Sequence, residues 1–163
     1  MVEEYSLLLP YPEVSGSLPV KQLEILSDLY AGRFSKLTAV ASYGYQLVVL
    51  EGENNLSELF KGVFTVELKH LRLLASAIFS FGAAPVFAGK FNYFSFRYVD
   101  YSNKIKDSLL NAIEREKSFC FHLEQFASFC QNQSLANLLL RIAKDEMLHE
   151  RLFSDRLERE LGC

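Results

Sequence analysis

The sequence predicts an all-α fold, a four-helix bundle made of two antiparallel hairpins joined by a long crossover. Four long segments repeat apolar residues at helical spacing. Two of the three connections between them are short and polar, whereas the middle connection is long and aromatic. Residues 19–163 are therefore expected to form one bundle domain, preceded by an N-terminal extension over residues 1–18.

The four predicted helices cover approximately residues 19–50, 56–81, 104–130 and 134–160. Gly52 and Asn54 mark the turn after the first helix, and Pro85 closes the second. The aromatic connection over residues 83–103 is too long for a tight turn, so we expect it to cross along the bundle. Ser134 is the expected N-cap of the last helix.

The composition is that of a folded, mildly acidic chain. Half of the residues are hydrophobic and 23% are charged, which suits a substantial core. A net charge of −3 offers no basic surface for nucleic acid. No apolar stretch is long enough for a membrane span, and the acidic start is unlike a secretion signal, so we expect a cytoplasmic protein. The cysteines, Cys120, Cys130 and Cys163, form no C-x-x-C pair, which argues against a rubredoxin-type iron centre.

The second and fourth predicted helices each contain a Glu-x-x-His pair, Glu67 with His70 and Glu146 with His149. Residues three apart lie on one face of a helix, so a carboxylate and an imidazole can bind the same metal ion. Both pairs fall on the apolar, core-facing stripe of their helix. Because ionisable groups are costly to bury unless they are paired or metal-bound, this repeated spacing predicts a metal site inside the bundle.

Hairpin geometry predicts which residues face these pairs from the other two helices. Glu116 and Glu146 lie at similar distances before and after the turn near Asn132, so we expect them at the same level of the bundle. The same comparison in the first hairpin pairs Glu67 with Lys36. The two half-bundles match in spacing, but a cation stands where a fourth carboxylate is expected.

The position of Lys36 leaves three interpretations open. Its ammonium group could lie between Glu67 and Glu116, so that a buried salt bridge replaces a metal ion. It could instead leave one metal position open and give a mononuclear or asymmetric site. A nearby positive charge could also depress its pKa, so that the neutral amine acts as a base or a ligand.

Four segments resemble the helical blocks of the ferritin-like superfamily, in particular those of manganese-catalase-like and rubrerythrin-like proteins. The segments are residues 30–39, 66–71, 113–116 and 145–149. In that family the corresponding side chains hold two iron or manganese ions that react with peroxide or oxygen. The resemblance implies as metal ligands Glu67, His70, Glu116, Glu146 and His149, with Lys36 in place of the first-helix glutamate.

The resemblance also places Asp145 beside the metal, and Tyr43 lies on the same helix stripe as Lys36. In such proteins an aspartate next to the second pair hydrogen-bonds the histidine across the bundle, here His70, and fixes its tautomer. A tyrosine near a di-metal site can donate electrons or protons, and simple core packing is the alternative role for Tyr43.

Two functions are expected from these observations. The first is an iron- or manganese-binding protein, with two ions, one or none, that acts on peroxide or oxygen at the carboxylate–histidine site. The second is a metal-free structural or assembly protein in which salt bridges of Lys36 replace the metal charge. Apolar residues 47–50 and the aromatic crossover are the candidate surface of a homodimer.

Overall fold

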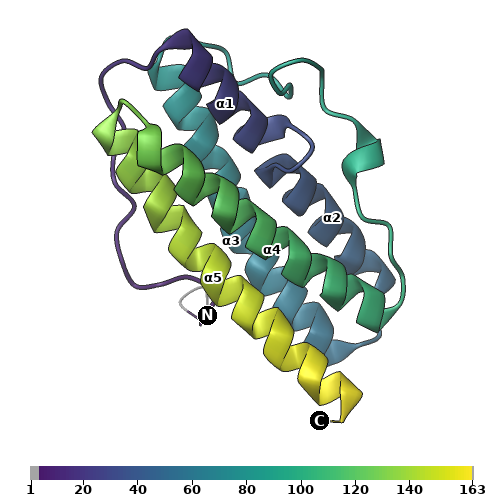
Figure 1. The fold of residues 1–163 in the computed structure, drawn as a ribbon. Coiled ribbons are helices and arrows are strands. Elements are labelled where there is room, and N and C mark those ends of the chain that lie inside the picture. Colours follow the sequence, from purple (N-terminus) through teal and green to yellow (C-terminus); the bar gives the residue numbers. More distant parts are fainter. Residues whose placement is uncertain (1–3, 163) are drawn as a thin grey trace.

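The computed structural model describes residues 4–162, and over this range the chain is a helical bundle (Figure 1). Residues 1–3 and Cys163 lie outside the described residues, and so do the expectations that rest on the acidic start of the chain and on the third cysteine. The elements are α1 (Val20–Ala31), α2 (Lys36–Val49), α3 (Asn54–Ser80), the short 3-10 helix η2 (Phe96–Tyr98), α4 (Ile105–Phe129) and α5 (Gln133–Leu161).

The predicted fold class is confirmed. Helices α2 and α3 form one hairpin, α4 and α5 form the other, and the connection over residues 81–104 runs along the outside of the bundle between them (Figure 1). The crossover carries η2 and one isolated bridge between Ala88 and Tyr93. Among the described residues, no helix combines the length and the hydrophobicity needed to cross a membrane.

The prediction of a single first helix is wrong, because residues 19–50 form two helices. α1 ends at Gly32, whose N–H donates to the backbone oxygen of Asp28 at 2.8 Å, and a β-carbon on Gly32 would lie 2.7 Å from that oxygen. Ser35 then caps α2 by accepting the N–H of Thr38 at 3.2 Å. The break makes Lys36 the first residue of α2.

The hydrophobic core is divided into two clusters along the bundle. One cluster includes Leu26, Leu74 and Leu139, and the other surrounds Phe60 and Phe153. Between them lies a band of polar side chains that are at most 1% exposed: Lys36, Glu67, His70, Glu116, Asp145, Glu146 and His149. The core thus contains one polar level with apolar packing above and below it, which keeps bulk water away from these groups.

Two local predictions are also wrong. Asn132, not Ser134, caps α5, since its side-chain oxygen accepts the N–H of Leu135 at 2.8 Å. Leu50 is buried in the second cluster, which reduces the apolar patch predicted over residues 47–50 to Val48 and Val49. The crossover aromatics are largely exposed, at Phe87, Phe91, Tyr93, Phe96 and Tyr101. A homodimer through this surface stays a prediction.

Candidate metal centre

The residues singled out in the sequence meet at one level inside the bundle. α3 supplies Glu67 and His70, α4 supplies Glu116, and α5 supplies Glu146 and His149. They converge because each lies on the core-facing stripe of its helix, one helical turn from a buried apolar residue. α2 brings Lys36 to the same level, as the hairpin comparison predicts.

His149 is oriented by the backbone of the N-terminal segment. Its Nε2 lies 2.8 Å from the carbonyl oxygen of Tyr5, and a carbonyl can only accept, so Nε2 carries the proton. In a neutral ring Nδ1 is then the free lone pair. Nδ1 lies 3.2 Å from Glu67 Oε1 and 3.4 Å from Glu116 Oε2. A proton on Nδ1, or a metal ion placed between these three acceptors, satisfies them.

His70 has the same arrangement on the opposite hairpin. Its Nε2 lies 3.1 Å from Asp145 Oδ2 and 3.1 Å from the Tyr11 hydroxyl, so the contact with Asp145 expected from the resemblance is present. Its Nδ1 faces the centre, 3.1 Å from Glu146 Oε1 and 3.4 Å from Glu67 Oε1. Both histidines therefore turn the same nitrogen toward the carboxylates.

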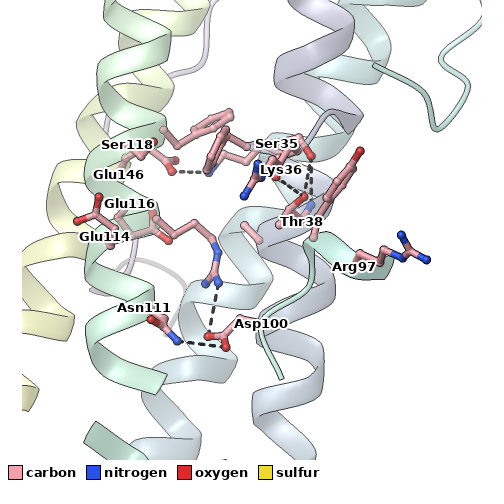
Figure 2. Close-up of a pocket in the computed structure, with 16 residues that line it drawn as sticks. Ser35, Lys36, Thr38, Arg97, Asp100, Asn111, Glu114, Glu116, Ser118 and Glu146 are labelled. Atoms are coloured by element: carbon pink, nitrogen blue, oxygen red, sulfur yellow. Dashed lines mark hydrogen bonds and ion pairs between the residues drawn. The ribbon is translucent and has the colours of Figure 1, made fainter. Parts of the chain in front are cut away.

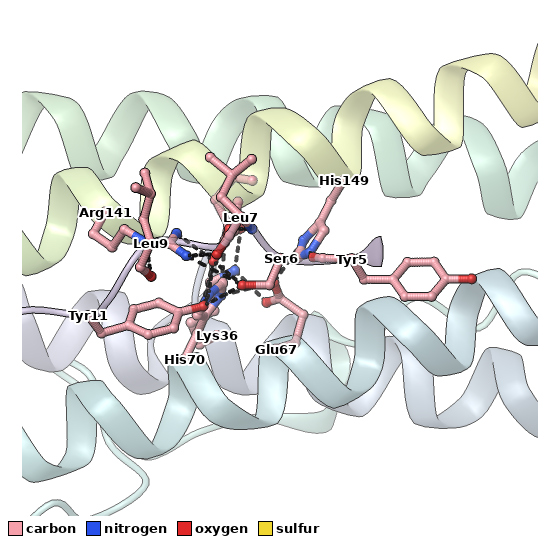
Figure 3. Close-up of polar contacts among 12 residues, drawn as sticks. Tyr5, Ser6, Leu7, Leu9, Tyr11, Lys36, Glu67, His70, Arg141 and His149 are labelled. Atoms are coloured by element: carbon pink, nitrogen blue, oxygen red, sulfur yellow. Dashed lines mark hydrogen bonds and ion pairs between the residues drawn. The ribbon is translucent and has the colours of Figure 1, made fainter. Parts of the chain in front are cut away.

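Lys36 forms buried ion pairs with Glu67 and Glu146 (Figures 2 and 3). The sequence correctly places its ammonium group among the carboxylates, but the expected partner Glu116 is wrong. The ammonium also lies 4.2 Å from the ring centre of Phe119, so an aromatic face covers it on the side of α4. The ammonium group of Lys36 thus holds the carboxylates of Glu67 and Glu146 together in the way that a metal ion would.

Glu116 has a different partner. The hydroxyl of Tyr43 donates to its Oε1, which leaves Oε2 facing His149. The Tyr43 ring also packs against Phe60 and Phe153, with centroids 5.6 Å apart in each case. Tyr43 therefore packs in the core and also donates a hydrogen bond to the centre, while its donation of electrons or protons stays a prediction.

The pKa values show which charges this packing favours. Burial lowers the pKa of Lys36, but Glu146 and Glu67 outweigh that effect and raise the pKa above its usual value. Burial opposes ionisation of Glu67, yet the charge of Lys36 holds its pKa well below the usual range. Burial together with the charge of Glu67 raises the pKa of Glu146 to about 7. For His70 and His149 burial lowers the pKa, and the carboxylates that surround each ring more than reverse this, to about 10. The lysine is therefore an ammonium ion, and a neutral amine is disfavoured.

The N-terminal segment closes the centre on the side of α3 and α5, which the sequence did not reveal (Figure 3). Asp145 accepts hydrogen bonds from Ser6 Oγ at 3.2 Å, Leu7 N at 2.9 Å, Tyr11 Oη at 2.5 Å and His70 Nε2 at 3.1 Å. It also forms an ion pair with Arg141 Nη1 at 2.8 Å. Arg141 also donates to the backbone oxygens of Leu7 and Leu9. The spacing of Arg141 and Asp145, one helical turn apart, is the signal from which their ion pair could have been predicted. The contacts across more than 130 residues have no such signal.

A cavity of about 290 Å³ connects the centre with the surface beside the break between α1 and α2 (Figure 2). Buried Lys36, Glu116 and Glu146 form its inner end, and the exposed side chains of Arg33 and Arg97 lie at its mouth. A water molecule occupies roughly 30 Å³ of liquid, so the cavity admits small molecules readily. The helix break thus provides one route from the surface to the centre.

The donor set fits a metal ion. Five atoms at the centre have no hydrogen-bond partner among the described residues: Glu67 Oε1, His70 Nδ1, Glu116 Oε2, Glu146 Oε1 and His149 Nδ1. Ligand atoms of Glu67, Glu116, Glu146 and His149 all lie within 4.8 Å of one another. Buried acceptors of this kind are rarely left without a partner. Carboxylate oxygens and imidazole nitrogens together suit divalent iron or manganese.

Fold and site together define a ferritin-like bundle with a carboxylate–histidine cluster in its core. The rubrerythrin family matches residues 38–157, well over half of the sequence, and the chain belongs to that family. The matched range includes both Glu-x-x-His pairs and Glu116, and it begins just after Lys36. None of the curated proteins compared with this sequence matches it significantly.

Solved structures share the fold. One is KatB, a manganese catalase from Anabaena, which superposes with a TM-score of 0.84 at 16% identity, covering 93% of this chain and 78% of that one. Another is the bacterioferritin of Desulfovibrio desulfuricans, described with a diiron site, with a TM-score of 0.72 at 21% identity and coverage of 87% and 82%. At these identities the likeness establishes the common architecture.

Proposed function

We propose that this protein binds one iron or manganese ion in its core and acts there on a small oxidant, peroxide or oxygen. The observation that carries the proposal is the set of five buried, inward-facing oxygen and nitrogen atoms without a hydrogen-bond partner among the described residues. Membership of the rubrerythrin family supports it. So does the fold shared with a manganese catalase and with a bacterioferritin that has a diiron site.

The charges of the centre favour one ion over two. Three buried carboxylates, Glu67, Glu116 and Glu146, and the ammonium of Lys36 leave an excess of two negative charges when both imidazoles are neutral. One divalent ion balances that excess. A second divalent ion would leave uncompensated positive charge in the core, which is costly. Lys36 thus takes the place of the second cation.

The protein groups around the ion have separable tasks. A bound iron or manganese ion would supply an open coordination position and a redox couple. Lys36 holds protons on Nζ at the inner end of the cavity, and Tyr43 holds a proton against Glu116. Tyr5 and Asp145 fix the two imidazoles with Nδ1 inward. The apolar clusters above and below keep bulk water from the centre.

Metal analysis tests the proposal. Protein purified from cells supplied with iron and manganese is expected to carry about one ion per chain, and Glu146→Ala is expected to lose it. Glu158→Ala, on the exposed surface of the same helix, is the matched control and keeps the metal. Consumption of peroxide or oxygen by the loaded protein is the second measurement. Wild-type protein that stays empty, and takes up no ion on titration, would refute the metal site.

Metal binding is expected to strengthen as the pH rises. The pKa values of His70 and His149, about 10 without metal, mean that an ion must displace a proton from each imidazole that it binds. Between pH 6 and pH 8 the apparent affinity should therefore rise about tenfold per pH unit for each displaced proton. Calorimetric titrations in buffers of different ionisation enthalpy count the protons released. An affinity independent of pH would show that the imidazoles are not ligands.

The metal-free alternative rests on the ion pairs of Lys36. With both imidazoles protonated, His70, His149 and Lys36 balance the three carboxylates without any ion. In that state the raised histidine pKa values stabilise the fold at pH values below the usual histidine pKa, about 6.5, and this contribution is lost as the pH rises through 10. An empty wild type together with a metal-filled Lys36→Glu variant would favour this structural role.

A further inference from the structure

A second and smaller cavity, of about 180 Å³, reaches the centre between α4 and α5. These two helices lie side by side along most of their length (Figure 1). The cavity is lined by four carboxylates, Glu116 and Glu124 from α4 and Glu146 and Glu150 from α5. It therefore approaches the same ligands as the first cavity, through a different wall of the bundle.

The four carboxylates differ in depth, and the two outer ones, Glu124 and Glu150, lie on opposite sides of the inner pair along the groove because α4 and α5 run antiparallel. Glu116 and Glu124 are eight positions apart on α4, with Cys120 midway, so they line one face of that helix over about 12 Å. Glu146 and Glu150 are one turn apart on α5. The inner pair, Glu116 and Glu146, is at most 1% exposed, and each residue has a carboxylate oxygen without a hydrogen-bond partner among residues 4–162. The outer pair is in contact with solvent.

The two cavities differ in charge. The larger one is lined by equal numbers of acidic and basic side chains. In the smaller one, Lys117 is the single basic side chain beside the four carboxylates within the described part of the chain. Its ammonium group lies 3.4 Å from Glu150 Oε1 and is largely exposed. A narrow cleft of one charge raises the local concentration of ions of the opposite charge.

We propose that the groove between α4 and α5 is the route by which divalent cations reach the centre, with Glu124 and Glu150, one on each side of the inner pair along the groove, as the outer carboxylates that attract them. This inference rests on the proposed function, because it presumes that the inner carboxylates bind metal. The outer pair attracts the hydrated ion, and the unpaired oxygens of Glu116 and Glu146 then receive it at the inner level. Lys117 opposes capture by neutralising part of the charge of Glu150.

The rate of cobalt uptake tests the route. Metal-free full-length protein is mixed with Co²⁺ in a stopped-flow instrument, and the absorption of bound cobalt is followed at low ionic strength. The double variant Glu124→Gln/Glu150→Gln is expected to bind cobalt about tenfold more slowly. Its equilibrium affinity should change by no more than about threefold, and the difference in rate should shrink in strong salt. Lys117→Gln is expected to act in the opposite direction and accelerate uptake.

Two further variants separate the possible outcomes. Asp107→Asn/Glu158→Gln changes the net charge equally on the same two helices, outside the groove, and should leave the rate unchanged. Ser118→Phe adds bulk at the wall of the larger cavity. If Ser118→Phe slows uptake while the double glutamine variant binds at the wild-type rate, the groove is not the route, although the metal centre stands. If wild type binds no cobalt, the proposed function fails and the route fails with it.

Discussion

Replacing Lys36 by glutamate is expected to raise the metal content from about one divalent ion per chain to about two. The ammonium of Lys36 lies between Glu67 and Glu146, where it stands in for a cation. A carboxylate at the same place restores the four-carboxylate, two-histidine set from which the sequence departs. Metal analysis after saturation with iron or manganese, with competition titrations, measures the change.

The same variant should couple folding to metal. Without an ion, four carboxylates would meet in the core against only the two protonated imidazoles of His70 and His149, which is unfavourable. At a metal concentration about a thousand times Kd, binding adds about 4 kcal/mol to the free energy of unfolding. Lys36→Gln is the control, since it removes the ammonium without adding a ligand, and it should stay at about one ion. A Lys36→Glu protein that still binds one ion would show that Lys36 does not occupy a metal position.

Replacing Asp145 by alanine is expected to lower the free energy of unfolding by about 3–5 kcal/mol. Asp145 is fully buried and pairs with Arg141, which is only 5% exposed, at 2.8 Å. The substitution leaves that guanidinium buried without its carboxylate. It also removes the acceptor for Leu7 N and the Tyr11 hydroxyl, so the N-terminal segment loses its anchor. Urea unfolding of the metal-free protein measures the loss.

Two further variants show whether the loss of stability in Asp145→Ala is specific to the contacts of Asp145. Asp155→Ala, on the exposed face of the same helix, should change stability by less than about 0.5 kcal/mol. Tyr11→Phe removes the hydrogen bond to the Asp145 carboxylate, together with the weaker contacts of the same hydroxyl with Ser6 and His70, and should cost about 1.5–3 kcal/mol. If Asp145→Ala matches Asp155→Ala, the N-terminal segment does not depend on this anchor.

The stability that Asp145 contributes is expected to decrease in acid. Burial opposes its charge, but hydrogen bonds from His70 and Tyr11, among others, hold the pKa of Asp145 well below its usual range. A lowered pKa contributes stability above the pKa of an unfolded aspartate, about 3.9, and loses it as the pH falls further. Wild type should therefore approach the stability of Asp145→Ala in acid. The anchor also orients His70, so Asp145→Ala is expected to weaken metal binding about 10–100-fold.

The sequence by itself determined the helical bundle and the level of its polar centre. Periodic apolar residues define the helix faces, and the spacing of Glu67, His70, Glu146 and His149 on those faces follows from the pitch of a helix. Equal distances from a turn placed Lys36 beside Glu67, because the two arms of a hairpin advance at the same rate. These relations depend only on the helix pitch and on the distance from a turn, so they can be derived from the sequence alone.

Tertiary structure decided the rest. The extended backbone of Gly32 ends α1, and the side chain of Ser35 starts α2 by accepting the N–H of Thr38, while helical periodicity on both sides concealed the break. Which carboxylates pair with Lys36 depends on side-chain rotamers set by packing, so Glu146 rather than Glu116 could not be predicted. The anchoring of the N-terminal segment on Asp145 and His149 joins residues more than 130 positions apart. An irregular segment has no periodicity from which such contacts could be read, and only the folded core brings its partners together.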